Sequence, residues 1–307
     1  MSDYQDIVDF GDCTGVTGGE YAIALFERGI VRAQFVGAPL VYQFDKIHTT
    51  RGCSVAGSVA ALGSSLVFFL SDDGFYSLRG GQELVPIGAE KINKYFLGRL
   101  KTANRQNIRS AVDPLQQIVV WAYPSVDSAD GSNDELIIYN YFLGRWSRAT
   151  VSVTALAPLF TSGYTLEGLD AVSTSIDALP ASLDSELWMG GTFFFAAGAD
   201  KKVQSFTGDC LSATVETGEF QHGQRRSIVN TIVPYVTGVS PTISAAIGSR
   251  TLQHGVIPTF SAVSSVTDEG FCPLRSEGRY HRVRLNISGD WEQAQGLDVD
   301  ARSLGLR

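Results

Sequence analysis

The sequence predicts an all-β protein: a β-propeller-like domain of antiparallel blades, followed by a C-terminal β-sandwich or barrel-like domain. Three observations predict it. Charged residues make up only 18% of the 307 residues, while 32 are Gly, which is the composition of a turn-rich β protein rather than of a helical bundle. Paired apolar runs recur along the first two thirds of the chain. After about residue 224, longer segments alternate apolar and polar residues.

Two strand pairs near the N-terminus share one local pattern. Residues 21–36 form an apolar run, a polar turn at Glu27-Arg28-Gly29 and a second run, and residues 66–78 repeat this pattern around Asp72-Asp73-Gly74. An Asp-Gly step between apolar runs is a strong hairpin signal, because the tight turn needs positive φ at its central positions. The spacing between the two turns is that expected of propeller blades.

Two further hairpins and one helix are expected before residue 210. Residues 117–123 pair with 135–142 across a polar insert, and residues 187–196 pair with 202–206. Residues 90–100 contain no turn dipeptide and place apolar side chains at helical spacing, so they predict a short helix.

These elements divide the chain into three parts. Residues 1–20 are expected to form an N-terminal loop or arm, residues 21–222 the propeller-like domain, and residues 223–307 the C-terminal β domain. In the last domain Val283, Leu285 and Ile287 alternate with polar residues, which predicts a strand with one buried face.

Motifs for catalysis, cofactor binding or metal binding do not stand out. The Gly-rich stretch 11–19 lacks the Gly-Lys-Ser/Thr ending of a phosphate-binding loop, so a plain loop is expected there. The four cysteines and four histidines are widely spaced, and no two of them have metal-ligand spacing. We therefore expect no catalytic, cofactor-binding or metal-binding residues, and a chain that is not an enzyme.

Two carboxylate pairs are candidates for a glycosidase site. Asp72 and Asp73 are explained by their hairpin turn. Asp298 and Asp300 alternate along a strand and indicate a solvated face. A propeller enzyme such as a glycoside hydrolase needs two separated, essential carboxylates, and neither pair stands out as such.

One basic cluster rises above the acidic background, and it comprises Arg275, Arg279, Arg282 and Arg284. Two interpretations of it stay open. In the first, the arginines lie on an exposed sheet face and pair with carboxylates of this chain or of a neighbouring copy. In the second, they face a DNA backbone or a partner protein.

The overall charge limits the kinds of partner. A formal net charge of -8 argues against electrostatic gripping of nucleic acid, which needs clustered Lys and Arg. It is compatible with a channel lining past which DNA slides. No apolar run approaches the length of about 18 residues that a membrane span needs, and the acidic N-terminus does not resemble a signal peptide, so no membrane anchor is expected.

Several stretches resemble tail hub or nozzle proteins of tailed bacteriophages, which are also called packaged-DNA stabilisation proteins or tail accessory factors. The stretches are FVGAPLVYQFDKI (35–47), residues 51–96, TVETGEFQ (214–221), and residues 271–307 with their Gly-Arg-Tyr, Trp and final Gly-x-Arg. The resemblance covers most of residues 20–307. Family members usually have more sequence ahead of the first blade. A propeller that is incomplete, completed by another subunit or preceded by further sequence is therefore expected.

The resemblance implies a structural virion protein of the phage tail, assembled in the host cytoplasm. Such proteins form a homo-oligomeric ring, typically a hexamer, below the portal and adaptor proteins, where they extend the DNA channel and help close it. The implied partners are portal and adaptor proteins, tail fibre or tail-tip proteins, and double-stranded DNA that passes through the lumen without sequence-specific binding. No cofactor is implied.

The main alternative is a carbohydrate-binding β-propeller, acting as an adhesin or as a receptor-binding protein of the tail tip. Trp121, Trp146 and Trp188 suggest it, because aromatic rings can stack on sugars. All three lie inside apolar or hairpin strings, where packing in the core is the ordinary explanation.

Overall fold

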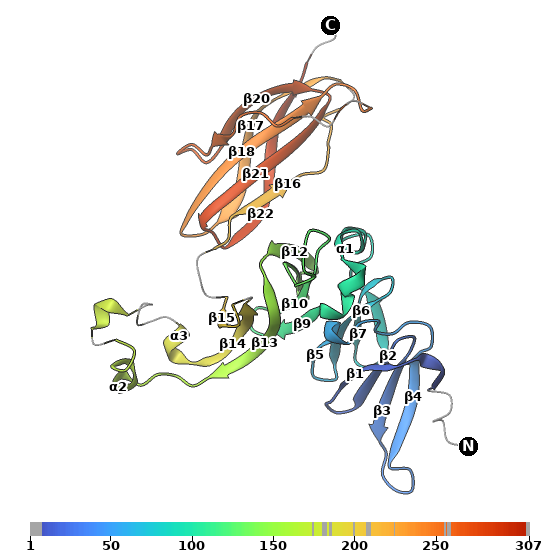
Figure 1. The fold of residues 1–307 in the computed structure, drawn as a ribbon. Helices are drawn as coiled ribbons and strands as arrows, with labels where there is room; N and C mark the ends of the chain where they lie inside the picture. The colour runs from blue at the N-terminus through green and yellow to red at the C-terminus, as the bar shows by residue number, and fades with distance from the viewer. Residues whose placement is uncertain are drawn as a thin grey trace. The chain divides into compact units, whose positions relative to one another are not determined.

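The computed structural model describes residues 8–173, 175–179, 183, 186–198, 200–206, 210–223, 225–254, 256 and 259–304. The chain divides into two compact units, Met1–Phe206 and Thr207–Arg307 (Figure 1). Residues 1–7 of the predicted arm and the closing Gly305-Leu306-Arg307 lie outside the described residues.

The first unit consists of four antiparallel sheets, each formed by strands consecutive in sequence (Figure 1). The first sheet contains β1 (Cys13–Thr17), β2 (Ala22–Phe26), β3 (Ile30–Phe35) and β4 (Tyr42–His48); the second contains β5 (Ala60–Leu62), β6 (Leu66–Ser71), β7 (Gly74–Arg79) and β8 (Glu83–Pro86). The third contains β9 (Arg109–Asp113), β10 (Ile118–Tyr123), β11 (Glu135–Asn140) and β12 (Arg145–Thr150), and the fourth β13 (Val153–Thr161), β14 (Gly191–Gly198) and β15 (Val203–Ser205). The predicted propeller-like series of antiparallel blades is confirmed.

Consecutive sheets pack face to face through strands that are buried on both faces. Along β6, Val67 and Phe69 pack in one core with the first sheet, whereas Phe68 and Leu70 pack in another with the third sheet. A strand directs successive side chains to opposite faces, so the run Leu-Val-Phe-Phe-Leu holds two neighbouring blades at once.

The third sheet repeats this arrangement through β10. Trp121 and Tyr123 face the core shared with the second sheet, and Val120 and Ala122 face the core shared with the fourth. The first strands of the blades lie on one side of the series, because β5 contacts β9 and β9 contacts β13. This is the inner-strand arrangement of a propeller.

The predicted arm is part of the first blade rather than a loop. Within the Gly-rich stretch, β1 pairs with β2, with Val16 opposite Ala24. The predicted domain start at residue 21 is therefore too late. Phe10 packs over the turn at Gly29, where an added Cβ would lie 2.4 Å from the Phe10 ring. Contact with this ring, and not the sequence pattern alone, requires glycine at this turn.

Among the described residues, short helices lie between the first three sheets and in the connection from β13 to β14 within the fourth sheet. The α-helices are α1 (Asn93–Arg99), α2 (Leu166–Leu169) and α3 (Glu186–Met189), and 3₁₀ helices lie at Val8–Phe10, Ala56–Ser58, Thr102–Asn107 and Ile176–Ala178. The helix α1 confirms the prediction for residues 90–100. The helix α3 occupies the start of the strand predicted over 187–196. Gly190 and Gly191, with φ values of 73° and 135°, turn the chain after α3, and the strand begins at Gly191.

The second unit is a sandwich of two antiparallel sheets, which confirms the predicted C-terminal β domain. One sheet has the order β16 (Ala213–Glu216), β21 (Tyr280–Asp290), β18 (Ser240–Arg250) and β19 (Ser264–Ser265), and the other has the order β20 (Cys272–Gly278), β17 (Ser227–Thr237) and β22 (Gln293–Ser303). As predicted, Val283, Leu285 and Ile287 point into the core between the sheets.

The boundary between the units lies earlier than the predicted position after residue 222. The short strand β16 pairs with β21, with Glu216 opposite Arg284, so residues around 213–222 belong to the sandwich. A four-residue edge strand has too little periodicity to be recognised in sequence.

A buried histidine links the two sheets of the sandwich. The ring of His281 is fully buried on β21. Its Nε2 lies 2.8 Å from Ser227 Oγ of β17, and its Nδ1 lies 2.7 Å from Ser249 Oγ of β18. Ser276 of β20 donates to Ser249 Oγ at 2.7 Å. The network satisfies both ring nitrogens without an acidic partner.

Burial of this ring holds the pKa of His281 below its ordinary value of 6.5. Charge on the nearby His222 acts in the same direction, while a backbone hydrogen bond with Gly278 opposes it. The sandwich therefore accommodates the neutral imidazole.

We expect the second unit to lose stability as the pH falls below about 6.5, because unfolded His281 takes up a proton that the buried ring does not. A His281→Gln variant keeps a donor and an acceptor but cannot titrate. Its free energy of unfolding should therefore change less between about pH 7 and pH 5. Thermal unfolding of the full chain at several pH values measures this, with the exposed His254 replaced in the control variant His254→Gln. The role is refuted if His281→Gln and the wild type show the same pH dependence.

Candidate functional site

The four arginines predicted as one cluster are separated by the fold. Arg275 lies on β20, in the sheet with β17 and β22. Arg282 and Arg284 lie on β21 in the opposite sheet, and Arg279 lies in the connection between the two strands. The chain leaves one sheet at Gly278 and enters the other at Tyr280. Arginines that are close in sequence therefore lie on two different sheets.

Arg282 and Arg284 share one carboxylate of the same unit. Arg282 Nη2 lies 2.7 Å from Glu216 Oε2, and Arg284 Nη2 lies 2.6 Å from Glu216 Oε1. The Arg284 guanidinium also lies 3.9 Å from the centroid of the Phe260 ring. Each guanidinium therefore has a partner within the chain, as the first interpretation of the cluster expects.

Arg279 belongs to a second group on the same side of the sandwich. Its guanidinium lies 5.6 Å from the centroid of the Tyr280 ring, and that of Arg250 lies 5.8 Å from the same ring. Arg250 is also paired with Glu219, whose hydrogen bond raises the pKa of Arg250. An aromatic ring between two guanidinium groups reduces their repulsion.

Sequence reasoning missed the glutamates and Arg250. Glu216 and Glu219 lie in the stretch TVETGEFQ, and Arg250 ends β18. These three residues are far along the chain from Arg282 and Arg284. They come close to them because β16 and β18 both pair with β21. The alternation of β21 indicated which arginines share a face, but no local signal indicated their partners.

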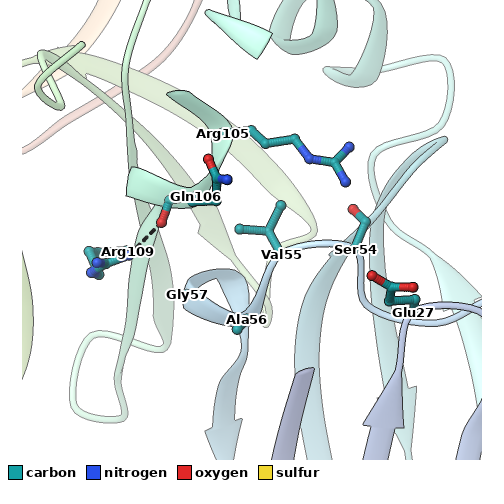
Figure 2. A pocket seen from close by; sticks show the side chains of 8 residues that line it. All are labelled: Glu27, Ser54, Val55, Ala56, Gly57, Arg105, Gln106 and Arg109. Atoms are coloured by element: carbon teal, nitrogen blue, oxygen red, sulfur yellow. Dashed lines mark hydrogen bonds between the residues drawn. The ribbon is translucent and has the colours of Figure 1, made fainter. Parts of the chain in front are cut away.

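A cavity of about 590 Å³ lies where connections of the first three blades meet (Figure 2). Glu27 comes from the turn between β2 and β3, the segment 54–57 joins the first blade to the second, and Arg105, Gln106 and Arg109 precede or begin β9. The residues lining the cavity are Glu27, Ser54, Val55, Ala56, Gly57, Arg105, Gln106 and Arg109.

Close backbone approach shapes the wall of this cavity. The carbonyl of Gly57 accepts a hydrogen bond from Ser110 Oγ at 3.0 Å, and an added Cβ at Gly57 would lie 2.0 Å from the Ile108 carbonyl oxygen. Glycine at this position therefore lets the connection between the first two blades touch the beginning of the third.

Two guanidinium groups and one carboxylate give the cavity its polar character. Arg109 Nη1 donates to the carbonyls of Gln106 and Ile108, both at 2.8 Å. Arg105 Nη1 lies 3.5 Å from Asp72 Oδ1, and Figure 2 shows its side chain extending toward Ser54. Sequence analysis did not single out this site, since its residues come from separate connections without a shared motif.

A buried ionic group lies elsewhere in the first unit. Arg99, at the end of α1, pairs with the buried Glu135 of β11 and, at 2.8 Å, with the exposed Asp127. The hydroxyl of Tyr123 donates to the other oxygen of Glu135. Burial of the phenol is the main cause that raises the pKa of Tyr123, and the hydrogen bond with Glu135 raises this pKa further. The group anchors α1 and the 124–134 insert to the third blade.

The two carboxylate pairs that the sequence offers as glycosidase candidates lie in different places. Asp72 and Asp73 lie at the turn between β6 and β7, and Asp298 and Asp300 lie on the exposed strand β22. Asp73 accepts a hydrogen bond from the Tyr76 hydroxyl at 2.7 Å and lies 3.3 Å from the Arg51 guanidinium. Asp298 accepts a hydrogen bond from the Tyr235 hydroxyl, and Asp300 lies near Arg302. Across the described ranges, no group of three or more His, Cys, Asp and Glu residues is arranged to hold a metal ion. In the same ranges, no helix is long and apolar enough to cross a membrane.

No family model matches this chain, and no curated protein matches it. Among solved structures, the chain is similar to a glycoside hydrolase family 43 arabinoxylan arabinofuranohydrolase from Bacillus subtilis in complex with cellotetraose. The sequences are 10% identical, the match covers 94% of this chain and 77% of that chain, and the TM-score is 0.22.

This comparison corrects one expectation. The sequence predicts a chain that is not an enzyme, but a solved structure that the chain matches is that of an enzyme, so that expectation does not stand. A TM-score of 0.22 at 10% identity carries no argument for a particular reaction, and we assign none to this chain.

We expect a Glu216→Gln variant to gain affinity for double-stranded DNA, because it releases Arg282 and Arg284 from their shared partner. The dependence of log affinity on log salt should steepen by about 1 to 2. Fluorescence anisotropy with a duplex of arbitrary sequence measures this. Glu292→Gln, which removes an exposed carboxylate of the same unit, is the control for net charge. Equal binding by the two variants would show that Glu216 does not mask the arginines.

For the buried ionic group, we expect Glu135→Gln to lower the free energy of unfolding by about 2 kcal/mol, because the half-buried Arg99 loses its buried partner. Asp127→Asn removes the exposed partner of the same guanidinium and should cost less than about 0.5 kcal/mol. Urea unfolding of the full chain compares the two variants. If the costs were similar, the buried carboxylate would not be the anchor.

Proposed function

We propose that this chain is a structural protein of a tailed-phage virion. It would form a ring-shaped tail hub or nozzle below the portal and adaptor proteins, extending the DNA channel and helping to close it. The stretches that resemble this family support the proposal, because they form the framework of both units. Residues 35–47 and 51–96 form blade strands and α1, and residues 214–221 and 271–304 contribute to the sandwich.

The pairing of Arg282 and Arg284 with Glu216 is the observation that carries the proposal. A conduit must let DNA slide, and guanidinium groups free to bind phosphate would hold it. In this chain two of the four arginines of the basic cluster, Arg282 and Arg284, are neutralised in part by Glu216, within a net charge of -8. Double-stranded DNA is accordingly proposed to pass through the lumen without sequence-specific binding.

The adhesin alternative loses the feature that suggested it. Trp121 is fully buried and donates to the Ser58 carbonyl, Trp146 packs on the core of the second and third blades, and Trp188 is buried. The buried rings of Trp121 and Trp188 are not available to stack on a sugar, and the partly buried Trp146 donates its Nε1–H to the Ile87 carbonyl.

The experiment that tests the proposal is the mass and outline of the purified protein, measured by light scattering and negative-stain electron microscopy. We expect a ring with an open lumen and a mass near six times 33.1 kDa, either alone or with the portal and adaptor proteins of the same virion. A compact monomer that never assembles with these partners would contradict the proposal. Specific binding in a glycan screen would then favour the adhesin.

A further inference from the structure

The two end sheets of the blade series each have a face that no described core covers. One core joins the first and second sheets, another the second and third, and a third the third and fourth. Among the described residues, no core cluster joins the fourth sheet to the first. Over the described part of the chain, the series is therefore an open arc whose two outer sheet faces join no second sheet, and we call them the leading face (on β1–β4) and the trailing face (on β13–β15).

Phe10 packs on Phe26 and Lys46 at one end of the leading face, and the exposed remainder of the face is apolar. Register places Val16 beside Ala24, Ala33 beside Phe44, and Phe35 beside Tyr42, all on the side away from the second sheet. The rings of Phe35 and Tyr42 pack edge to face at 5.7 Å. Even so, Val16, Phe35 and Tyr42 are 67%, 64% and 55% exposed.

The opposite side of the same hairpin is polar. Arg32 pairs with Asp45 at 2.9 Å, and Gln43 donates to the same carboxylate at 2.9 Å. The hairpin of β3 and β4 therefore presents one polar side and one apolar side, and the apolar side is the one directed away from the neighbouring blade.

The trailing face is apolar as well. Ala155 lies beside Ala197, which in turn lies beside Val203. Leu159 projects to the same side further along β13. These residues alternate with Leu156 and Ala196, which point into the core shared with the third sheet. Val203 is 64% exposed and Leu159 is 42% exposed.

Neither face has the composition of a sheet surface in water. A sheet with one solvated face alternates apolar and polar residues along its strands. Here β2 and β13 instead place alanines at the outward positions, where they leave a flat surface that allows close approach of a second sheet.

The exposed area is comparable to that of a protein interface. The apolar side chains of the leading face and of the adjoining hairpin tip (Val36, Leu40 and Val41) expose on the order of 700 Å². The largest apolar patch of a typical monomer is about 300–600 Å², and each partner in a stable complex buries about 800 Å². The leading face therefore has the size of one half of a stable interface.

We propose that the leading face of one copy packs on the trailing face of the next copy, so that the arc of blades continues from subunit to subunit. The contact is head-to-tail, since it joins two different surfaces of the same chain, and such contacts generate rings when their rotation closes. This inference rests on the proposed function and specifies which surfaces form the ring.

Two double variants test the contact, each altering one face with exposed residues. Phe35→Glu/Phe44→Glu places charge on the leading face, and Leu159→Glu/Val203→Glu places it on the trailing face. Each variant alone should be monomeric, with a mass of 33.1 kDa. An equimolar mixture should contain a 1:1 dimer, because each variant retains the face that the other has lost. Light scattering measures all three samples.

The mixture also separates loss of contact from loss of folding, because a misfolded variant cannot form the dimer. Leu115→Glu/Phe142→Glu is the matched control. Both side chains are 74% exposed but lie at turns of the third sheet, so this variant should assemble as the wild type does. If both variants unfold cooperatively in urea as the wild type does, a mixture without a dimer would overturn the head-to-tail contact and favour pairing of like faces or packing of the two faces within one chain.

The outcomes also distinguish this inference from the proposed function. If the wild type forms a ring and each face variant forms the same ring equally well, the inference is overturned and the tail-hub proposal stands. A wild type that stays monomeric even with portal and adaptor proteins would overturn both. If the leading-face variant assembles normally but no longer floats with vesicles of phosphatidylcholine and phosphatidylglycerol, the face binds lipid and the inference is wrong.

Discussion

Burial of β6 on both faces is the constraint on which the first unit depends. Val67 and Phe69 require a sheet on one side, and Phe68 and Leu70 require a sheet on the other. Successive side chains of a strand point in opposite directions. Burial of this one apolar run therefore requires the first and third sheets to pack on the two faces of the second. The strand β10 extends the stack by the same means. The cavity at the blade connections, the position of α1 and the two end faces all follow from this stacking.

The charges of the sandwich depend on strand pairing in a similar way. Glu216 meets Arg284 because β16 lies beside β21 in the register that places them opposite each other, and Arg282 reaches the same carboxylate two residues away. Two of the four arginines that form a basic cluster along the chain, Arg282 and Arg284, therefore belong to an ion-pair network within the sandwich. This distinction matters for function, because free guanidinium groups bind phosphate, whereas paired ones lend rigidity and a weaker field.

An open series of blades connects the fold to assembly. Closed propellers bury every blade face within one chain, whereas this chain leaves an apolar face at each end of its series among the described residues. Exposed apolar area of this size favours association. Two different end faces favour a directional contact rather than a symmetric pair. The proposed head-to-tail contact would use both of these end faces.

The sequence allowed individual turns, strands and one helix to be predicted, but not which of these elements pair with each other. The Asp-Gly turn at Gly74, the alternation of Val283, Leu285 and Ile287, and the helical spacing before Leu100 each identified an element, because turn conformation and side-chain periodicity depend on near neighbours. Tertiary structure alone decided the rest: that β1 completes the first blade, that β16 joins the sandwich, that Arg275 is parted from Arg282, and that Glu216 lies between two arginines. These facts depend on which strands pair and in which register. Pairing between segments far apart is selected by burial of whole sheet faces, a property that no single segment carries.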